Sequence, residues 1–208
     1  MSRMSPNALH RALTLPGDPV LRPLPRQVAV LLEELNAPPR LAAHLRAVHD
    51  VAHQLADWAE QHYPQLDFDR HAVLFGAATH DIGKVLHPEE LSRPGSEHEE
   101  AGHDLLIARG VTEELAQFAR SHASWNAPGI STDDLLVSVA DKIWKGKRVT
   151  DLEQLLIDRL AEAGHQRPWE AFMALDEFLN HIAHDAERRL AFQAEHPVTL
   201  GIGERPTH

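Results

Sequence analysis

Residues 77–84 read Ala-Ala-Thr-His-Asp-Ile-Gly-Lys, in which an apolar run ends at the adjacent pair His80 and Asp81 and is followed by a glycine and Lys84. A neutral imidazole and a carboxylate are both good ligands for Zn, Fe or Mn. Neighbouring residues on a helix project about 100° apart, so both side chains can reach metal ions lying beside the helix. The stretch therefore predicts a helix end that carries part of a metal site.

The dipeptide needs support from its setting, because His-Asp pairs also occur at residues 49–50, 103–104 and 184–185. Those three pairs lack the flanking small residues and the glycine-lysine sequel. Only the pair at residues 80–81 is therefore interpreted as part of a chemical site.

Composition indicates one globular domain. The chain has 208 residues, of which 43% are hydrophobic, enough for a single core. No apolar run approaches the roughly 20 residues that span a bilayer, and the N-terminus lacks the pattern of a signal peptide. We therefore expect a cytoplasmic protein without a membrane partner. Cysteine is absent, so histidine, aspartate or glutamate must hold any metal, and zinc-finger sites are excluded.

The net charge of −11 argues against nucleic acid as a partner, because a binder of the phosphate backbone presents a broad basic face. The lysines are nevertheless unevenly placed. One, Lys84, follows the His-Asp pair, and the other three lie just after Asp141, at positions 142, 145 and 147. This distribution indicates an anion-binding region, although each lysine taken alone could equally be a solvated surface residue.

Hydrophobic periodicity predicts an all-α fold, with no strand alternation and no internal repeat. Helices are predicted over residues 26–35, 41–63, 68–81, 98–108, 112–122, 133–144, 152–163 and 169–195. The first 25 residues are rich in proline and are predicted to form a flexible arm. Residues 26–195 should form a single helical domain, and residues 196–208 a mobile tail.

Several residues far apart in the chain now form an ordered set: a histidine on an early helix, the His80-Asp81 pair, and Asp141 on a later helix. This set resembles the HD-domain superfamily of metal-dependent phosphohydrolases, with an HD core over about residues 41–148. The string His-Asp-Ile-Gly-Lys matches the commonest core string of that family, and residues 139–142 resemble its later aspartate segment. The resemblance implies a compact helical bundle, here with a C-terminal helical extension.

Two more segments resemble dinuclear members. Residues 98–106 are similar to a segment of HD-GYP and related proteins in which His98 would be a ligand. Residues 121–125 resemble their His-His-x-x-Trp segment, with Ser121 in place of the first histidine and His122 retained. One ligand and the Gly-Tyr-Pro signature are missing, which argues against cyclic dinucleotide cleavage. The six remaining ligands resemble those of YqeK-like diadenosine tetraphosphate hydrolases, and also those of mixed-valence diiron oxygenases, a group that includes inositol oxygenase.

The first ligand is either His44 or His49. The spacing of His44 to Val48 and Ala52 resembles that of the family's first histidine. A hairpin of helices with matched lengths would instead place His49 opposite His80. Any one of these histidines, taken alone, is more often a hydrogen-bonded core residue than a ligand, so the metal site depends on the joint pattern.

The resemblance implies one or two divalent transition-metal ions, namely Mn, Fe, Zn, Ni or Co, or else Mg. Asp81 would bridge two ions. The first histidine, His80 and Asp141 would complete one site, and His98 and His122 the other.

The expected function is hydrolysis of a phosphoester or phosphoanhydride in a nucleotide or another small phosphorylated metabolite, by water that the metal activates. Lys84, one helical turn beyond His80, would bind the phosphate or orient the water. Further phosphate contacts would come from Lys142, Lys145, Lys147 and Arg148. A diiron oxygenase and a non-catalytic nucleotide-binding HD module are the alternatives.

Overall fold

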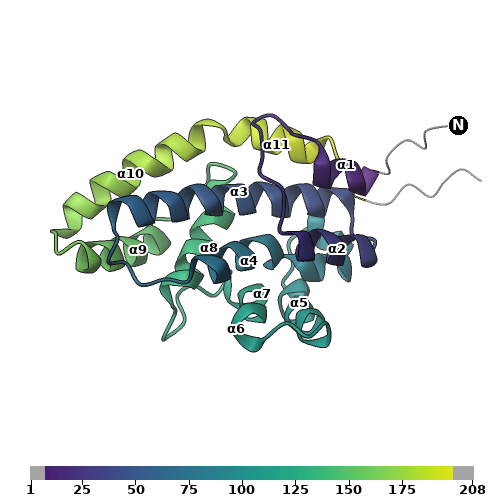
Figure 1. The fold of residues 1–208 in the computed structure, drawn as a ribbon, viewed down its shortest axis with the longest axis horizontal. Coiled ribbons are helices and arrows are strands. Elements are labelled where there is room, and N and C mark those ends of the chain that lie inside the picture. The colour runs from purple at the N-terminus through teal and green to yellow at the C-terminus, as the bar shows by residue number, and fades with distance from the viewer. Residues whose placement is uncertain (1–7, 199–208) are drawn as a thin grey trace, which may run out of the picture.

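The computed structural model describes residues 8–198, and within that range the chain forms helices and loops without a β-strand, as predicted. In chain order the helices are α1 (Ala8–Thr14), α2 (Arg26–Glu34), α3 (Pro39–His62), α4 (Arg70–Thr79), η1 (Ile82–Val85), η2 (Pro88–Leu91), α5 (Glu97–Ala108), α6 (Glu113–Ala116), α7 (Phe118–Ser121), α8 (Thr132–Ile143), α9 (Thr150–Ala163), α10 (Pro168–His184) and α11 (Ala186–Ala194). Figure 1 shows α3 running through the middle, with α10 and α11 along one side and α4 to α7 along the other.

Helix α3 is the axis of the bundle. Pro39 occupies its first turn, where the missing N–H of proline costs no helical hydrogen bond. The helix packs against α1, α4, α8 and α11, and its apolar residues Leu41, Leu45 and Val48 are fully buried. Because helices cover α3 on several sides, a polar residue on it can be enclosed inside the molecule.

Helix α4 begins at an aspartate cap and ends where the His-Asp pair begins. Oδ1 of Asp69 accepts hydrogen bonds from the backbone N–H groups of His71 and Ala72, at 2.8 and 3.1 Å. The α-helix stops at residue 79, His80 is its C-cap, and Asp81 precedes the 3-10 turn η1. The pair therefore lies at the end of the α-helix, as the sequence predicts, where a 3-10 turn follows.

Gly83 allows η1 to lie directly against α5. A Cβ at this position would lie 2.0 Å from the carbonyl oxygen of His98 and 2.6 Å from the backbone nitrogen of Gly102. Only glycine permits so close an approach. This contact brings the start of α5 next to the His-Asp pair.

Helix α8 is fixed at its start and along its length. Ser131 and Asp134 form a capping box, in which each side chain accepts a hydrogen bond from the backbone N–H of the other. Farther along, Oγ of Ser138 donates to the carbonyl oxygen of His122 at 3.0 Å. The second of these bonds joins α8 to the residue that directly follows α7.

The N-terminal segment packs on the domain, so the prediction of a flexible arm is wrong for residues 8–25. Its apolar side chains are buried, namely Leu9, Ala12, Leu13, Leu21 and Leu24. Arg46 of α3 donates to carbonyl oxygens of this segment at Ala12, Leu15, Leu21 and Arg22. Prolines interrupt the periodicity, and the donor that satisfies the carbonyl groups is distant in sequence. Residues 1–7 lie outside the described range.

The helix predicted over residues 169–195 is divided at Asp185 into α10 and α11. The break lets α11 turn onto the bundle, where Nε of Arg189 donates to the carbonyl oxygen of Trp144 at 2.7 Å. The helix predicted over residues 112–122 is likewise two short helices, α6 and α7. Apolar periodicity continues through both breaks, so it could not reveal them.

The predicted mobile tail begins with packed residues. His196 is buried, and its carbonyl oxygen accepts a hydrogen bond from Nε of Arg40 at 3.0 Å. The backbone N–H of Arg40 donates to the carbonyl oxygen of Pro197 at 3.0 Å. The rest of the tail prediction falls on residues 199–208, which lie outside the described range.

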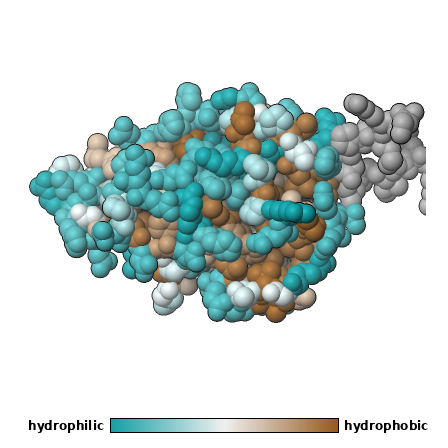
Figure 2. Space-filling view, viewed as in Figure 1, coloured by the Kyte–Doolittle hydropathy of each residue, from teal (hydrophilic) through white to brown (hydrophobic). Residues whose placement is uncertain are grey.

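Figure 2 shows a mostly hydrophilic surface, with hydrophobic residues gathered where α2 and α5 lie in Figure 1. A groove on this side is lined by Val30, Leu31, Phe75, Val111 and Leu115, and it contains none of the predicted metal ligands. Among residues 8–198, no helix combines the length and the apolarity needed to cross a membrane.

Candidate metal centre

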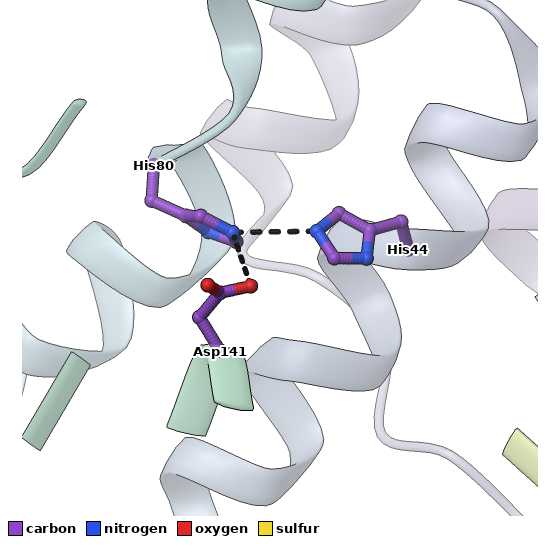
Figure 3. A group of neighbouring side chains, drawn as sticks. All are labelled: His44, His80 and Asp141. Carbon is purple, nitrogen blue, oxygen red and sulfur yellow. Dashed lines mark hydrogen bonds and ion pairs between the residues drawn. The ribbon is translucent and has the colours of Figure 1, made fainter. Parts of the chain in front are cut away.

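Three helices bring together a first group of ligands, which Figure 3 shows. His44 comes from α3, His80 from the end of α4, and Asp141 from α8. Nε2 of His80 lies 3.3 Å from Nε2 of His44 and 3.4 Å from Oδ1 of Asp141. All three side chains are buried, and their ligand atoms lie within 4.8 Å of one another. We call this group the first triad.

A second triad consists of Asp81, His98 and His122, which are also buried and equally close together. Oδ1 of Asp81 lies 3.0 Å from Nε2 of His98 and 3.6 Å from Nε2 of His122. His98 stands in the first turn of α5, and His122 directly follows α7.

The two oxygens of Asp81 face different triads. While Oδ1 faces the second triad, Oδ2 lies 3.0 Å from Nε2 of His44 and 3.7 Å from Nε2 of His80. One carboxylate therefore stands between both groups, in the place that a bridging ligand would occupy.

Backbone carbonyl groups fix the orientation of two histidine rings. Nδ1 of His80 lies 3.0 Å from the carbonyl oxygen of Ala77, and Nδ1 of His122 lies 3.1 Å from that of Ala119. A carbonyl oxygen can only accept, so Nδ1 carries the proton and Nε2 presents its lone pair to the cluster.

His98 is oriented instead by a carboxylate, because its Nδ1 contacts Oε2 of Glu90. No sequence pattern indicates Glu90, since it lies in the short turn η2, where no periodicity marks it. His44 differs again. Its buried Nδ1 has no hydrogen-bond partner among the described residues, and its ring lies edge-on to Trp144 with centroids 4.9 Å apart.

The electrostatic environment favours ionised carboxylates. Burial alone would raise the pKa of Asp81, but the adjacent imidazoles of His80, His44 and His98 hold it well below its usual range. Burial would likewise raise the pKa of Asp141, yet the adjacent imidazole of His80 and then the ammonium of Lys142 lower it.

The histidines differ in the direction of their pKa shifts. Burial, followed by the charge of His80, lowers the pKa of His122 to about 4. Burial also lowers the pKa of His44, although Asp81 opposes the shift. For His98, burial acts downward, but Asp81 and Glu90 outweigh it and raise the pKa. The lowered pKa values of His44 and His122 favour the neutral imidazole, which is the form that binds metal.

Two of the predicted substrate-binding lysines contact carboxylates of the two triads. Nζ of Lys84 lies 2.6 Å from Oδ2 of Asp81, and Nζ of Lys142 lies 2.6 Å from Oδ2 of Asp141. Both side chains are partly accessible, at 17% and 20% exposure, whereas the carboxylates are buried. The ammonium groups therefore place positive charge between the cluster and the solvent.

The other predicted substrate-binding residues are Lys145, Lys147 and Arg148. Lys145 and Lys147 are exposed, and Nζ of Lys145 lies 5.9 Å from the centre of a Trp144 ring. The contacts of Arg148 differ from those expected for its predicted role in substrate binding. Its guanidinium pairs with Glu153 at 2.7 Å and Asp176 at 2.8 Å, which ties the start of α9 to α10.

His49 lies outside both triads. It is buried on α3, where its ring packs edge-on against His53 with centroids 4.8 Å apart. The sequence left the first ligand open between His44 and His49, and the structure brings His44 to the cluster.

The two triads suit divalent cations of the transition series. They offer imidazole nitrogen and carboxylate oxygen, the donors that Mn, Fe, Zn and Co accept. Nε2 of His98 is buried and makes no hydrogen bond of normal geometry, although Oδ1 of Asp81 lies at 3.0 Å. A buried imidazole nitrogen without a hydrogen-bond partner fits the chemistry of a metal ligand.

Comparison with known proteins gives one positive finding. The family model of the HD domain matches residues 41–144, half of the chain, a range that includes every member of both triads. Searches of curated proteins and of solved structures found no match. HD domains bind divalent metals, and most members of the superfamily are metal-dependent phosphohydrolases. The chain belongs to the HD-domain family.

Proposed function

We propose that this protein is a dinuclear phosphohydrolase that cleaves a phosphoester or phosphoanhydride bond in a nucleotide or another small phosphorylated metabolite. The single observation that carries the proposal is the position of Asp81, whose two oxygens face two different histidine-containing triads. A carboxylate that serves two metal sites at once is typical of two-metal hydrolysis.

In this proposal the first triad, His44, His80 and Asp141, holds one cation, while His98 and His122 hold the other. Asp81 bridges the two. When bound, the cations would lower the pKa of a water molecule and neutralise charge on the phosphoryl group. The backbone acceptors of His80 and His122 keep Nε2 of each ring directed at the cluster.

Lys84 is proposed to bind the phosphate or to orient the attacking water. Its ammonium touches the bridging carboxylate and is still partly accessible, so one of its other N–H donors can reach a substrate oxygen. Lys142, beside Asp141, would contact a second anionic group, and the exposed Lys145 and Lys147 would add positive charge nearby. These charges favour an anionic substrate over a neutral one.

The test begins with protein purified without chelator, followed by metal analysis. Nucleotides and sugar phosphates are then assayed for phosphate release, with Mn, Fe and Mg added separately. We expect release that chelator abolishes. Substrate-dependent oxygen uptake without release would favour a diiron oxygenase. Nucleotide binding with neither activity would favour a non-catalytic module.

A matched pair of variants tests the site itself. Asp81→Ala should lose both cations and the activity. Asp104→Ala alters another His-Asp pair, where the aspartate is 72% exposed, and should retain both properties. Unchanged metal content and activity in Asp81→Ala would refute the proposed centre.

A further inference from the structure

Glu90 is a carboxylate enclosed at the edge of the second triad. Its side chain is only 6% exposed, and Oε2 contacts Nδ1 of the ligand His98. The opposite nitrogen of the same ring, Nε2, lies 3.0 Å from Oδ1 of Asp81. The imidazole of His98 therefore connects Glu90 to the proposed bridging carboxylate.

The backbone around Glu90 is shaped to receive its carboxylate. Oε1 accepts a hydrogen bond from the backbone N–H of Glu97 at 3.0 Å, and Oε2 accepts from that of His98 at 3.3 Å. A Cβ at Gly95 would lie 2.1 Å from Oε1, so a larger residue there would have to displace the carboxylate. Three donors and one glycine thus hold Glu90 in a single position.

We propose that Glu90 is a positioning residue for the second cation, an inference that rests on the proposed dinuclear function. Its carboxylate holds the proton of His98 on Nδ1, directs Nε2 toward Asp81, and increases the donor strength of the ring. A carboxylate behind a metal-bound histidine acts in this way in many metal sites.

This arrangement distinguishes His98 from the other ligands. Neutral backbone carbonyl groups support His80 and His122, whereas a carboxylate supports His98. The two sites should therefore depend differently on Glu90. Removal of the Glu90 carboxylate should lower the affinity of the second triad for its cation and leave the affinity of the first triad unchanged.

A purely structural role is the competing explanation, because Glu90 also caps α5. The side chain of the N-cap residue Ser96 makes no capping hydrogen bond, and the carboxylate of Glu90 supplies acceptors at that helix end instead. Glu90→Gln separates the two roles. It keeps the side-chain size and one oxygen acceptor for the helix end, but removes the negative charge behind His98.

The experiment titrates the chelator-treated full chain with Mn²⁺ alone in a calorimeter, without substrate. Co²⁺ absorption then reports the geometry of each site. His98→Asn and His44→Asn identify which binding step belongs to which triad. The matched control is Glu113→Gln, because Glu113 lies 3.0 Å from Nε2 of His103, a Glu-His pair outside the centre.

We expect Glu90→Gln to lower the affinity for the second cation alone, by about 10- to 100-fold, and to change the Co²⁺ spectrum of that site. Glu113→Gln should match the unaltered protein. Unchanged affinities in Glu90→Gln, even with a lower melting temperature, would leave the residue as a helix cap and overturn the inference. An equal loss of affinity for both cations would overturn the inference as well, because a general loss of structure would explain that result.

Gly95→Ala provides an independent variant if Glu90→Gln does not fold. Its methyl group would displace the carboxylate of Glu90, so the same selective weakening is expected. An equal loss of affinity for both cations in this variant would contradict the inference. If the unaltered protein binds no cation, the metal centre itself is refuted, and the role of Glu90 with it. If it binds two and Glu90→Gln does the same with equal affinity, only the inference about Glu90 fails.

Discussion

Nε2 of His44 lies 3.0 Å from Oδ2 of Asp81, and this contact joins the second turn of α3 to the segment between α4 and η1. His49, little more than one helical turn farther along α3, instead packs against His53. The two histidines therefore provide a matched pair, because both are buried and both stand on the same helix.

We expect His44→Gln to lose one of two bound cations, because the first triad loses a nitrogen ligand. His49→Gln should keep both. Metal content per chain, measured after dialysis against trace metal, distinguishes the variants. The reverse pattern, with metal lost only from His49→Gln, would show that the first ligand is misassigned.

Lys84 should matter for turnover rather than for metal binding. Its ammonium lies 2.6 Å from Asp81, but it is not a ligand, since a charged ammonium has no lone pair. Lys84→Met should retain both cations and lower kcat/KM by about 100-fold, the scale on which one well-placed charged donor stabilises a transition state. Lys84→Arg should recover part of the loss. If Lys84→Met lost its metal together with its activity, a structural role would explain the effect.

The main helices and most of the proposed ligands could be predicted because they depend on local patterns. Apolar residues recur along one face of α3, and the His80-Asp81 string carries the small residues that its tight surroundings require. Gly83 is an example, since the space beside it is filled by the backbone of α5.

Other features depend on contacts that no local pattern records. The choice between His44 and His49 depends on the rotation and the axial position of α3 against α4, because residues five positions apart differ in both. Glu90 reaches His98 through a loop whose path is set by Gly95. The packing of the N-terminal segment depends on Arg46, a donor that the sequence places in a different helix.

Arg46 should be important for the attachment of that segment. Its guanidinium donates to four carbonyl oxygens, among them those of Ala12 at 3.1 Å and Leu21 at 2.8 Å. Arg46→Met leaves these buried acceptors unsatisfied, at a cost of about 1–3 kcal/mol for each group that water cannot reach. We expect a lower melting temperature and faster proteolysis within residues 8–25.

The control for this variant is Arg11→Met, an exposed position on α1 that should change neither property. Equal protease sensitivity in both variants would show that Arg46 does not hold the segment.

His49 should make the stability of the protein depend on pH. Burial, followed by the charge of His53, lowers its pKa to about 3 in the folded chain, whereas an unfolded histidine titrates near pH 6.5. Between these values the unfolded chain binds a proton that the folded chain does not. The free energy of unfolding should therefore fall as the pH decreases through this window, by up to about 1.4 kcal/mol per pH unit.

Urea unfolding from pH 7 to 4, with chelator present so that metal binding does not contribute, measures this slope. His49→Gln removes the titrating group. The slope of the unfolding free energy against pH should therefore decrease by the amount that corresponds to about one proton. His71→Gln, at an exposed histidine of α4, should leave the curve as in the unaltered protein. An equal slope in His49→Gln would mean that other groups take up the proton on unfolding, and that the burial of His49 does not govern stability at acidic pH.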